Sequence, residues 1–387
     1  LYDVSVWYRE GQSLFHDRQI NALGISTRAR APFTFAVVSQ FAFRSDVDNP
    51  VERRKRMRAL FEELNLINPD FLVVTGGVAE GLWTGTDDAA TLFGLVEDSL
   101  AVPMFLVPNE NDTGRVALLG HTLRRRGALW SRVADSPHFH FTHRGFAFIG
   151  TDTFSCADRK RSILRHRDTE PGCIGAGELE WVEQQLKKAD RAGHPAVLFT
   201  HHSPTHNRWT NDQGLNVAVF DPESRKKLLQ LIRRYNVRAV FSGHVQRDTL
   251  QRVGGGTTLF VTTGRGRGLT TADRPAMRLV TVRNGTLDAD SISYVNKPAS
   301  TPVGEVSATF LKSNDGTASS NTITVNNGLK RPLHNMRLAA ILERKEDYSD
   351  YEVLGEADTF QTNGTTFQFV FLTFDLEPGA KRVFEIK

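Results

Sequence analysis

Short, continuous apolar runs alternate with amphipathic helical segments over most of this chain, and this alternation is the strongest constraint on its fold. The runs lie at 33–39, 71–75, 102–108, 146–150, 196–200, 238–242 and 258–263. Apolar runs without alternation are typical of strands that are covered on both faces. Strands separated by helices therefore predict an α/β domain with a mainly parallel sheet.

The segments between these runs carry helix signals. The first of them has Asn49 as N-cap, Pro50 at the first helical position and Glu52 at the third. Its apolar stripe consists of Met57, Leu60, Phe61 and Leu64. A similar apolar stripe begins at Leu179, and another follows the start signal Asp221-Pro222. Both segments are therefore also predicted to be helices that cover a sheet.

The pattern changes after Lys297. Short strand-like segments are separated there by Asn-Asp-Gly, Asn-Asn-Gly, Thr-Asn-Gly and Glu-Pro-Gly turns. This spacing predicts an Ig-like β-sandwich over residues 298–387, behind an α/β domain over 33–297. Residues 1–32 show no clear period, and we expect a lead-in segment that packs on the α/β domain.

Composition limits the classes of function. The chain has 387 residues and a formal net charge of +4, which is too small an excess for a dedicated nucleic-acid binder. No apolar run approaches 18 residues, so the sequence predicts no membrane-spanning helix and no membrane anchor of its own.

Candidate site residues follow the predicted strands, because ligands of open α/β sheets bind beyond the carboxyl ends of the strands. These segments are Gln40-Phe41-Ala42, Gly76-Gly77, Asn109-Glu110-Asn111-Asp112, His201-His202 and Gly243-His244-Val245-Gln246. Their order resembles the calcineurin-like metallophosphoesterase superfamily, which reads D-x-H, G-D, G-N-H-D/E, H and G-H-x-H after successive strands. The resemblance covers residues 33–294 and implies a four-layer α/β/β/α sandwich.

The site departs from the family pattern. Family members use two metal ions about 3.5 Å apart to activate a hydroxide for attack on phosphorus. At four positions where the resemblance implies metal ligands, the chain has Gln40, Ala42, Gly77 and Gln246. Alanine and glycine have no donor atom, and Gly77 replaces the carboxylate that bridges both metals. Asn111 replaces the histidine that assists the leaving group and cannot transfer a proton at neutral pH. We therefore expect no catalytic residues.

The second metal position keeps more donors. The resemblance places Glu110, His201 and His244 there, and two histidines with one carboxylate are a legitimate zinc set. The alternative is that both histidines are hydrogen-bonded remnants, with His202 pointing away or competing for the same space. We expect no cofactor, with one Zn or Mn ion as the alternative.

Two further features stay open at this level. The loop Gly264-Arg265-Gly266 is a candidate anion-binding loop, although a plain turn is the preferred explanation. Cys156 and Cys173 flank a polar loop, which they could close as a disulfide in an oxidising compartment. Two free thiols are the alternative.

These features predict an inactive metallophosphoesterase-like protein that serves as a structural or binding subunit of a larger protein assembly. The partner could be a membrane complex that is contacted from outside the bilayer. One alternative is a single-metal phosphoesterase that uses Glu110, His201 and His244, and another is a non-catalytic binder of a phosphate-bearing or anionic ligand. The missing initial methionine, the cysteine pair and the appended β-sandwich predict export to the periplasm or the cell exterior.

Overall fold

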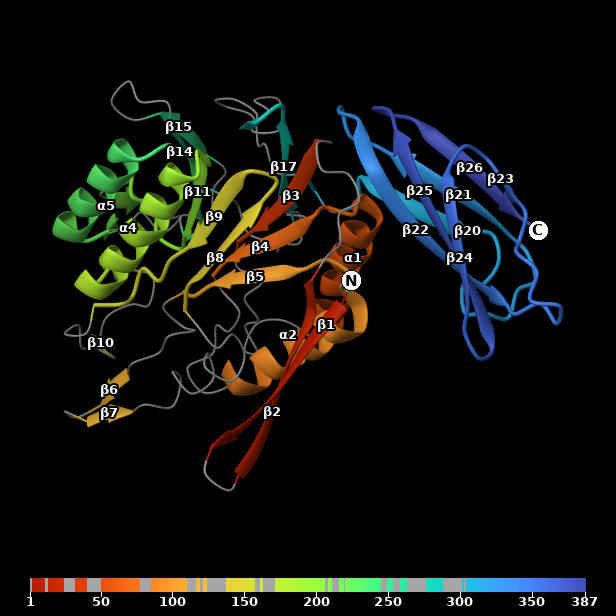
Figure 1. The fold of residues 1–387 in the computed structure, drawn as a ribbon, viewed down its shortest axis with the longest axis horizontal. Coiled ribbons are helices and arrows are strands. Elements are labelled where there is room, and N and C mark those ends of the chain that lie inside the picture. The colour runs from red at the N-terminus through yellow and green to blue at the C-terminus, as the bar shows by residue number, and fades with distance from the viewer. Residues whose placement is uncertain are drawn as a thin grey trace.

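A computed structural model describes most of the chain. The described residues are 2–10, 13–23, 32–39, 50–76, 85–109, 116–118, 121–123, 137–156, 161–162, 171–205, 208–210, 216–218, 220–244, 249–252, 258–262, 276–287, 301–302 and 304–387. Within them, two mixed sheets and four helices are followed by a C-terminal all-β unit (Figure 1).

The first mixed sheet is built around three parallel strands. These are β3 (Phe33–Val38), β4 (Phe71–Thr75) and β5 (Met104–Val107). The antiparallel strands β17 (Ala276–Arg283), β18 (Thr286–Leu287) and β19 (Thr301–Pro302) extend it beyond β3. Asn284 and Gly285, with φ of 49° and 74°, form the tight turn between β17 and β18, as an Asn-Gly hairpin favours.

The second mixed sheet has the order β15-β16-β14-β11-β9-β8. Its parallel strands are β9 (Phe146–Gly150), β11 (Ala196–Thr200), β14 (Val237–Ser242) and β16 (Leu259–Thr262). The antiparallel edge strands are β8 (Phe139–His143) and β15 (Thr249–Arg252). All seven apolar runs in the sequence are therefore parallel strands of one sheet or the other, which confirms the α/β prediction.

Helices cover the outer face of each sheet. The four helices are α1 (Pro50–Ile67), α2 (Gly85–Ser99), α4 (Ala176–Arg191) and α5 (Pro222–Arg234). Residues of α1 and α2 pack on the first sheet, and residues of α4 and α5 pack on the second. At the start of α5, the Asp221 side chain accepts a hydrogen bond from the Ser224 backbone N–H at 3.1 Å. This N-cap is the one that the sequence predicts.

Phenylalanines fill the space between the two sheets. The ring of Phe35 from β3 stacks on Phe71 at 5.2 Å between centroids and meets Phe148 and Phe241 edge-on from the opposite sheet. These residues belong to one buried cluster that draws on both sheets. The order of layers is thus helices, sheet, sheet and helices, as Figure 1 shows in outline.

The C-terminal unit consists of two antiparallel sheets. The four-stranded sheet contains β20 (Val306–Phe310), β21 (Asn321–Asn327), β26 (Lys381–Ile386) and β23 (Val353–Leu354). The three-stranded sheet contains β22 (Leu333–Glu343), β25 (Phe367–Leu376) and β24 (Asp358–Asn363). Alternate residues of β25 are buried, as expected when one face of a strand packs against a core.

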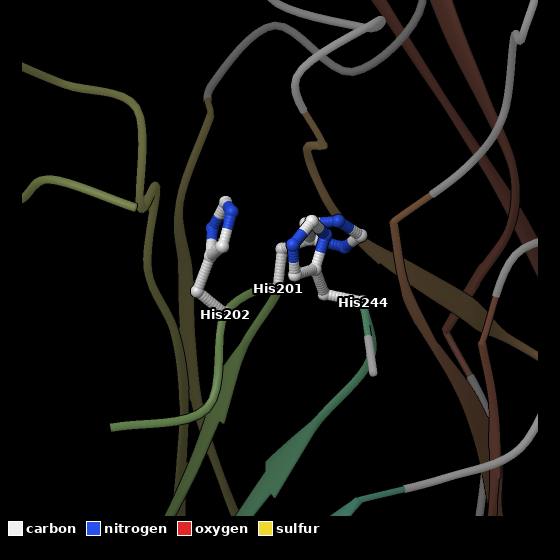
Figure 2. Close-up of side chains that lie close together, drawn as sticks. All are labelled: His201, His202 and His244. Carbon is white, nitrogen blue, oxygen red and sulfur yellow. The ribbon is translucent and has the colours of Figure 1, made fainter. Parts of the chain in front are cut away.

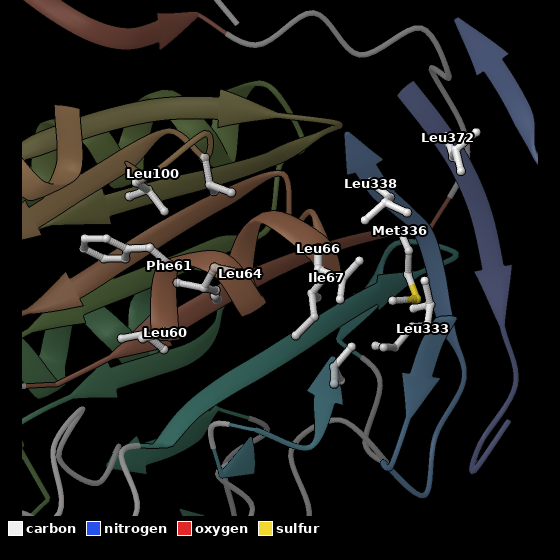
Figure 3. Close-up of a cluster of buried hydrophobic side chains, with 14 of the residues drawn as sticks. Leu60, Phe61, Leu64, Leu66, Ile67, Leu100, Leu333, Met336, Leu338 and Leu372 are labelled. Carbon is white, nitrogen blue, oxygen red and sulfur yellow. The ribbon is translucent and has the colours of Figure 1, made fainter. Parts of the chain in front are cut away.

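The C-terminal unit packs directly on α1. Leu66 and Ile67 at the end of this helix belong to the same buried cluster as Met336 and Leu338 of β22 (Figure 3). Glu63 of α1 is also buried in this junction, with 4% of its surface exposed. Its carboxylate oxygens accept hydrogen bonds from the backbone N–H groups of Gly304 at 2.6 Å and Val306 at 2.9 Å.

The N-terminal segment contains regular structure that the sequence pattern did not predict. β1 (Tyr2–Glu10) and β2 (Ser13–Leu23) pair as an antiparallel hairpin.

In the described part of the chain, five further short strands lie outside the two mixed sheets. They are β6 (Val116–Leu118), β7 (His121–Leu123), β10 (Arg161–Ser162), β12 (Arg208–Thr210) and β13 (Asn216–Ala218). Among the described residues, no helix has both the length and the apolar character needed to cross a bilayer.

Candidate metal centre

Three histidines meet at the carboxyl ends of two neighbouring strands. His201 and His202 directly follow β11, and His244 lies two residues after β14. Because β11 and β14 are parallel and paired, their carboxyl ends deliver these side chains to the same edge of the sheet (Figure 2). His201 and His202 have no exposed surface.

The three imidazoles are close enough to serve one cation. One ring nitrogen from each residue lies within 4.8 Å of the other two. Tetrahedral zinc with Zn–N bonds of about 2.0–2.1 Å has ligand nitrogens about 3.3 Å apart, so side-chain movements of up to about 1.5 Å would complete the set. Three histidines with an open fourth position are a recognised zinc ligand set.

His201 is oriented by a backbone carbonyl. Its Nδ1 lies 2.8 Å from the Thr75 carbonyl oxygen at the end of β4. A carbonyl only accepts, so Nδ1 carries the proton and the neutral ring presents the lone pair of Nε2. Gly76, with φ of +93°, lies beside this ring, and a Cβ there would collide with the imidazole and with Asn109. The chain therefore needs glycine at this position.

His202 is enclosed by the segment that follows β9. Its Nδ1 lies 2.9 Å from the Thr153 hydroxyl oxygen, and the Phe154 ring contacts the imidazole edge-on at 4.7 Å between centroids. Within the histidine cluster, the ring of His202 lies next to that of His244, and the two ring centroids are 4.3 Å apart. His202 is therefore part of the site and does not point away from it.

His244 has an unusual backbone conformation. Its φ is 61°, in the left-handed region that residues other than glycine seldom adopt. The preceding Gly243 donates its N–H to the His201 carbonyl at 3.0 Å, and a Cβ on Gly243 would run into Ser39 and Thr75. Tight packing around Gly243 thus holds His244 in this conformation, as is common for residues at functional sites.

Most of the positions expected from the sequence lie outside the described residues. These are Gln40, Ala42, Gly77, Glu110, Asn111, Gln246, Gly264, Arg265 and Gly266. His201 and His244 are described, and they lie close together with His202. Cys156 and Cys173 form a disulfide, one of the two states that the sequence left open.

Two site residues were missed in the sequence, namely His202 as a ligand candidate and Thr153 as its partner. From the sequence, His202 was expected to point away from the site or to compete with His201 for the same space. β11 ends at Thr200, however, and the chain bends at His201 and His202. The position of Thr153 just after a parallel strand was the signal that could have drawn attention to it.

Comparison with known families agrees with this architecture. The calcineurin-like phosphoesterase family matches residues 41–248, which is more than half of the chain. The match covers β4, β9 and β11, the three histidines of the candidate metal centre and the disulfide. The chain belongs to the calcineurin-like phosphoesterase family.

Individual relatives are more distant. A probable purple acid phosphatase 20 of Arabidopsis thaliana is 38% identical over 80 residues, which is 21% of this chain and 17% of that protein. A dimetal phosphatase from Danio rerio aligns with a TM-score of 0.48 at 14% identity, over 64% of this chain and 95% of that one. GAP50, the anchor in the inner membrane complex of Plasmodium, aligns with a TM-score of 0.44 at 15% identity, over 67% and 83%.

Proposed function

We propose that this protein keeps the phosphoesterase fold without two-metal hydrolysis and acts as a structural or binding subunit of a protein assembly. The observation that carries the proposal is the composition of the candidate metal centre. Among the described residues, the group that could hold a metal consists of His201, His202 and His244, and no aspartate or glutamate belongs to it.

The charge of two metal ions explains why this composition matters. Two divalent ions about 3.5–4 Å apart repel one another strongly, and phosphoesterase sites offset this repulsion with anionic ligands. Three neutral imidazoles contribute no negative charge. Gly77, at the position of the family's bridging carboxylate, contributes no side chain. The arrangement therefore favours at most one cation.

A single Zn or Mn ion on the three histidines is the cofactor that this geometry supports. When bound, such an ion polarises a water molecule or a phosphoryl oxygen. The chain itself supplies the orientation, since the Thr75 carbonyl fixes the tautomer of His201 and the Thr153 hydroxyl contacts His202. Asn111 stands where the family has the proton donor for the leaving group, so hydrolysis by this ion would lack its acid catalyst.

Two alternative functions would use the same edge of the sheet. A single-metal phosphoesterase on Glu110, His201 and His244 would need Glu110 to complete the ligand set. A non-catalytic binder of a phosphate-bearing ligand would use the histidines as hydrogen-bond donors, with Gly264, Arg265 and Gly266 as a second contact. Metal-dependent turnover favours the first of these, and saturable phosphate binding without turnover favours the second.

The C-terminal unit is the part that we propose as an Ig-like docking module. On the outward face of its three-stranded sheet, Phe360 is 63% exposed and Phe367 is 39% exposed. Exposed aromatic side chains are enriched as anchors in protein interfaces. The disulfide supports an exported protein, and the proposed partner is a protein assembly, for which a membrane complex contacted from outside the bilayer is one candidate.

Isolation from the native source tests the assembly. Gentle purification of the tagged chain is expected to co-isolate one partner in a fixed stoichiometry, and Phe360→Asp should lose that partner because it places a charge in the apolar contact. Val51→Asp, at an exposed apolar residue of α1 that is 69% exposed, is the matched control and should retain the partner. A monodisperse single chain at native abundance would contradict the proposal.

A further inference from the structure

His202 lies in a cradle made from two chain segments. Thr153 and Phe154, which follow β9, supply the hydroxyl contact at 2.9 Å and the edge-on ring contact. Gly172 lies against the ring, where an added Cβ would come within 2.6 Å of the imidazole Cγ. Both segments therefore contact the imidazole of His202, and this residue is fully buried.

The disulfide joins these same two segments. Cys156 lies three residues after Thr153, and Cys173 follows Gly172 directly. The backbone N–H of Cys173 also donates to the Thr153 carbonyl at 2.6 Å, and Phe154 forms a β-bridge with Cys173. The disulfide therefore joins the two segments within a few residues of each of their contacts with the His202 ring.

Apart from the disulfide, each segment is anchored to a different helix. The 151–152 end is held by Glu178 of α4, which accepts hydrogen bonds from the Thr151 hydroxyl at 2.6 Å and the Asp152 N–H at 3.0 Å. On the other side, Asp221 at the start of α5 donates its backbone N–H to the Gly172 carbonyl at 2.7 Å. Each segment is thus tied to its own helix, and the disulfide is the covalent tie between the two.

We infer that the Cys156–Cys173 disulfide and Thr153 position His202 as the third cation ligand, so that retention of a bound divalent ion depends on the disulfide. This inference rests on the proposed single-cation site. His201 is held from a different direction, by the Thr75 carbonyl in the first sheet. Loss of the disulfide should therefore release His202 while leaving the position of His201 in place.

The test is zinc affinity, measured on the full chain by competition with a chromogenic chelator. We expect Thr153→Val, which keeps the disulfide and the side-chain shape, to weaken zinc binding by about 10- to 100-fold, the usual range for loss of a group that orients a metal ligand. The double substitution Cys156→Ser with Cys173→Ser, or reduction of the native protein, should have an effect of similar size. Far-UV circular dichroism and urea unfolding establish that each variant is folded.

A double-mutant cycle separates positioning from general stabilisation. In the His202→Ala background, removal of the disulfide should no longer change zinc affinity, because the ligand that it positions is gone. Cobalt substitution gives a second readout, since the visible absorption of Co²⁺ reports the number of ligands and should match that of His202→Ala when the disulfide is absent.

The possible results of these measurements distinguish a failure of the proposed cation site from a failure of the positioning role of the disulfide. Wild-type protein that does not bind zinc, and that shows no change on His201→Ala, would overturn both the cation site and the role of the disulfide. Zinc binding that needs His201 but is unchanged by Thr153→Val and by loss of the disulfide would overturn the positioning role alone. An equal loss of affinity in the wild-type and His202→Ala backgrounds would also overturn it.

Discussion

Phe35→Ala should lower the free energy of unfolding by about 3–5 kcal/mol, the usual cost of removing a buried phenylalanine ring. The Phe35 side chain has no exposed surface. Its ring contacts four other phenylalanines from both sheets, Phe71, Phe148, Phe199 and Phe241. Such a close-packed aromatic cluster can collapse only partly around the missing ring, so a cavity remains between the sheets. Urea unfolding followed by far-UV circular dichroism measures the loss.

The matched control is Phe360→Ala. Phe360 is 63% exposed on the C-terminal unit and has one ring neighbour, Phe371, at 6.0 Å between centroids among the described residues. Its truncation should cost less than about 1 kcal/mol. Equal losses for the two variants would mean that the phenylalanine cluster between the sheets is not the main stabilising core of the fold.

Protein stability should fall as the pH rises from about 4.5 to about 7, through the titration of Glu63. Burial in the junction between α1 and the C-terminal unit raises the pKa of this carboxyl from its ordinary value of 4.5 to about 7, against the opposing effect of the hydrogen bonds from Gly304 and Val306. Between these pH values the folded chain keeps a proton that the unfolded chain has released. The free energy of unfolding therefore decreases with pH, by roughly 3 kcal/mol over the whole interval.

Glu63→Gln isolates this contribution, since glutamine stays neutral at every pH. The difference in unfolding free energy between wild type and variant should change by about 3 kcal/mol between pH 4.5 and pH 7.5, with the wild type relatively more stable at the acidic end. Glu62→Gln, at the exposed neighbouring position of the same helix, should leave the wild-type pH dependence unchanged. A wild-type profile that runs parallel to that of Glu63→Gln would show that the Glu63 carboxyl has no raised pKa.

The parallel strands were predictable because they are largely apolar on both faces, and in β4, β9 and β11 every residue is buried. The edge strand β8 was not among the predicted strands, although FHFTH alternates apolar and polar residues as a strand with one covered face does. The predicted strands of the α/β domain were all continuous apolar runs. The role of Glu63 could not be foreseen either. A glutamate between Leu60 and Leu64 of a helix is ordinarily a solvated residue, and only contact with the C-terminal unit buries it.

The candidate site was predictable in outline and not in detail. Strand order placed His201 and His244 at one edge of the sheet, because parallel strands that pair deliver their carboxyl ends together. The participation of His202 depends on the bend after β11 and on the segment that the disulfide closes. Both are tertiary features that hydrophobic periodicity does not encode.

We propose that this member of the calcineurin-like phosphoesterase family does not hydrolyse phosphoesters. The most direct test is steady-state hydrolysis of p-nitrophenyl phosphate and bis(p-nitrophenyl) phosphate by the purified chain with saturating Mn²⁺ or Zn²⁺. We expect a rate equal to that of a protein-free control containing the same metal. A metal-dependent rate that disappears on His244→Ala would contradict it and would establish the three-histidine centre as a catalytic site.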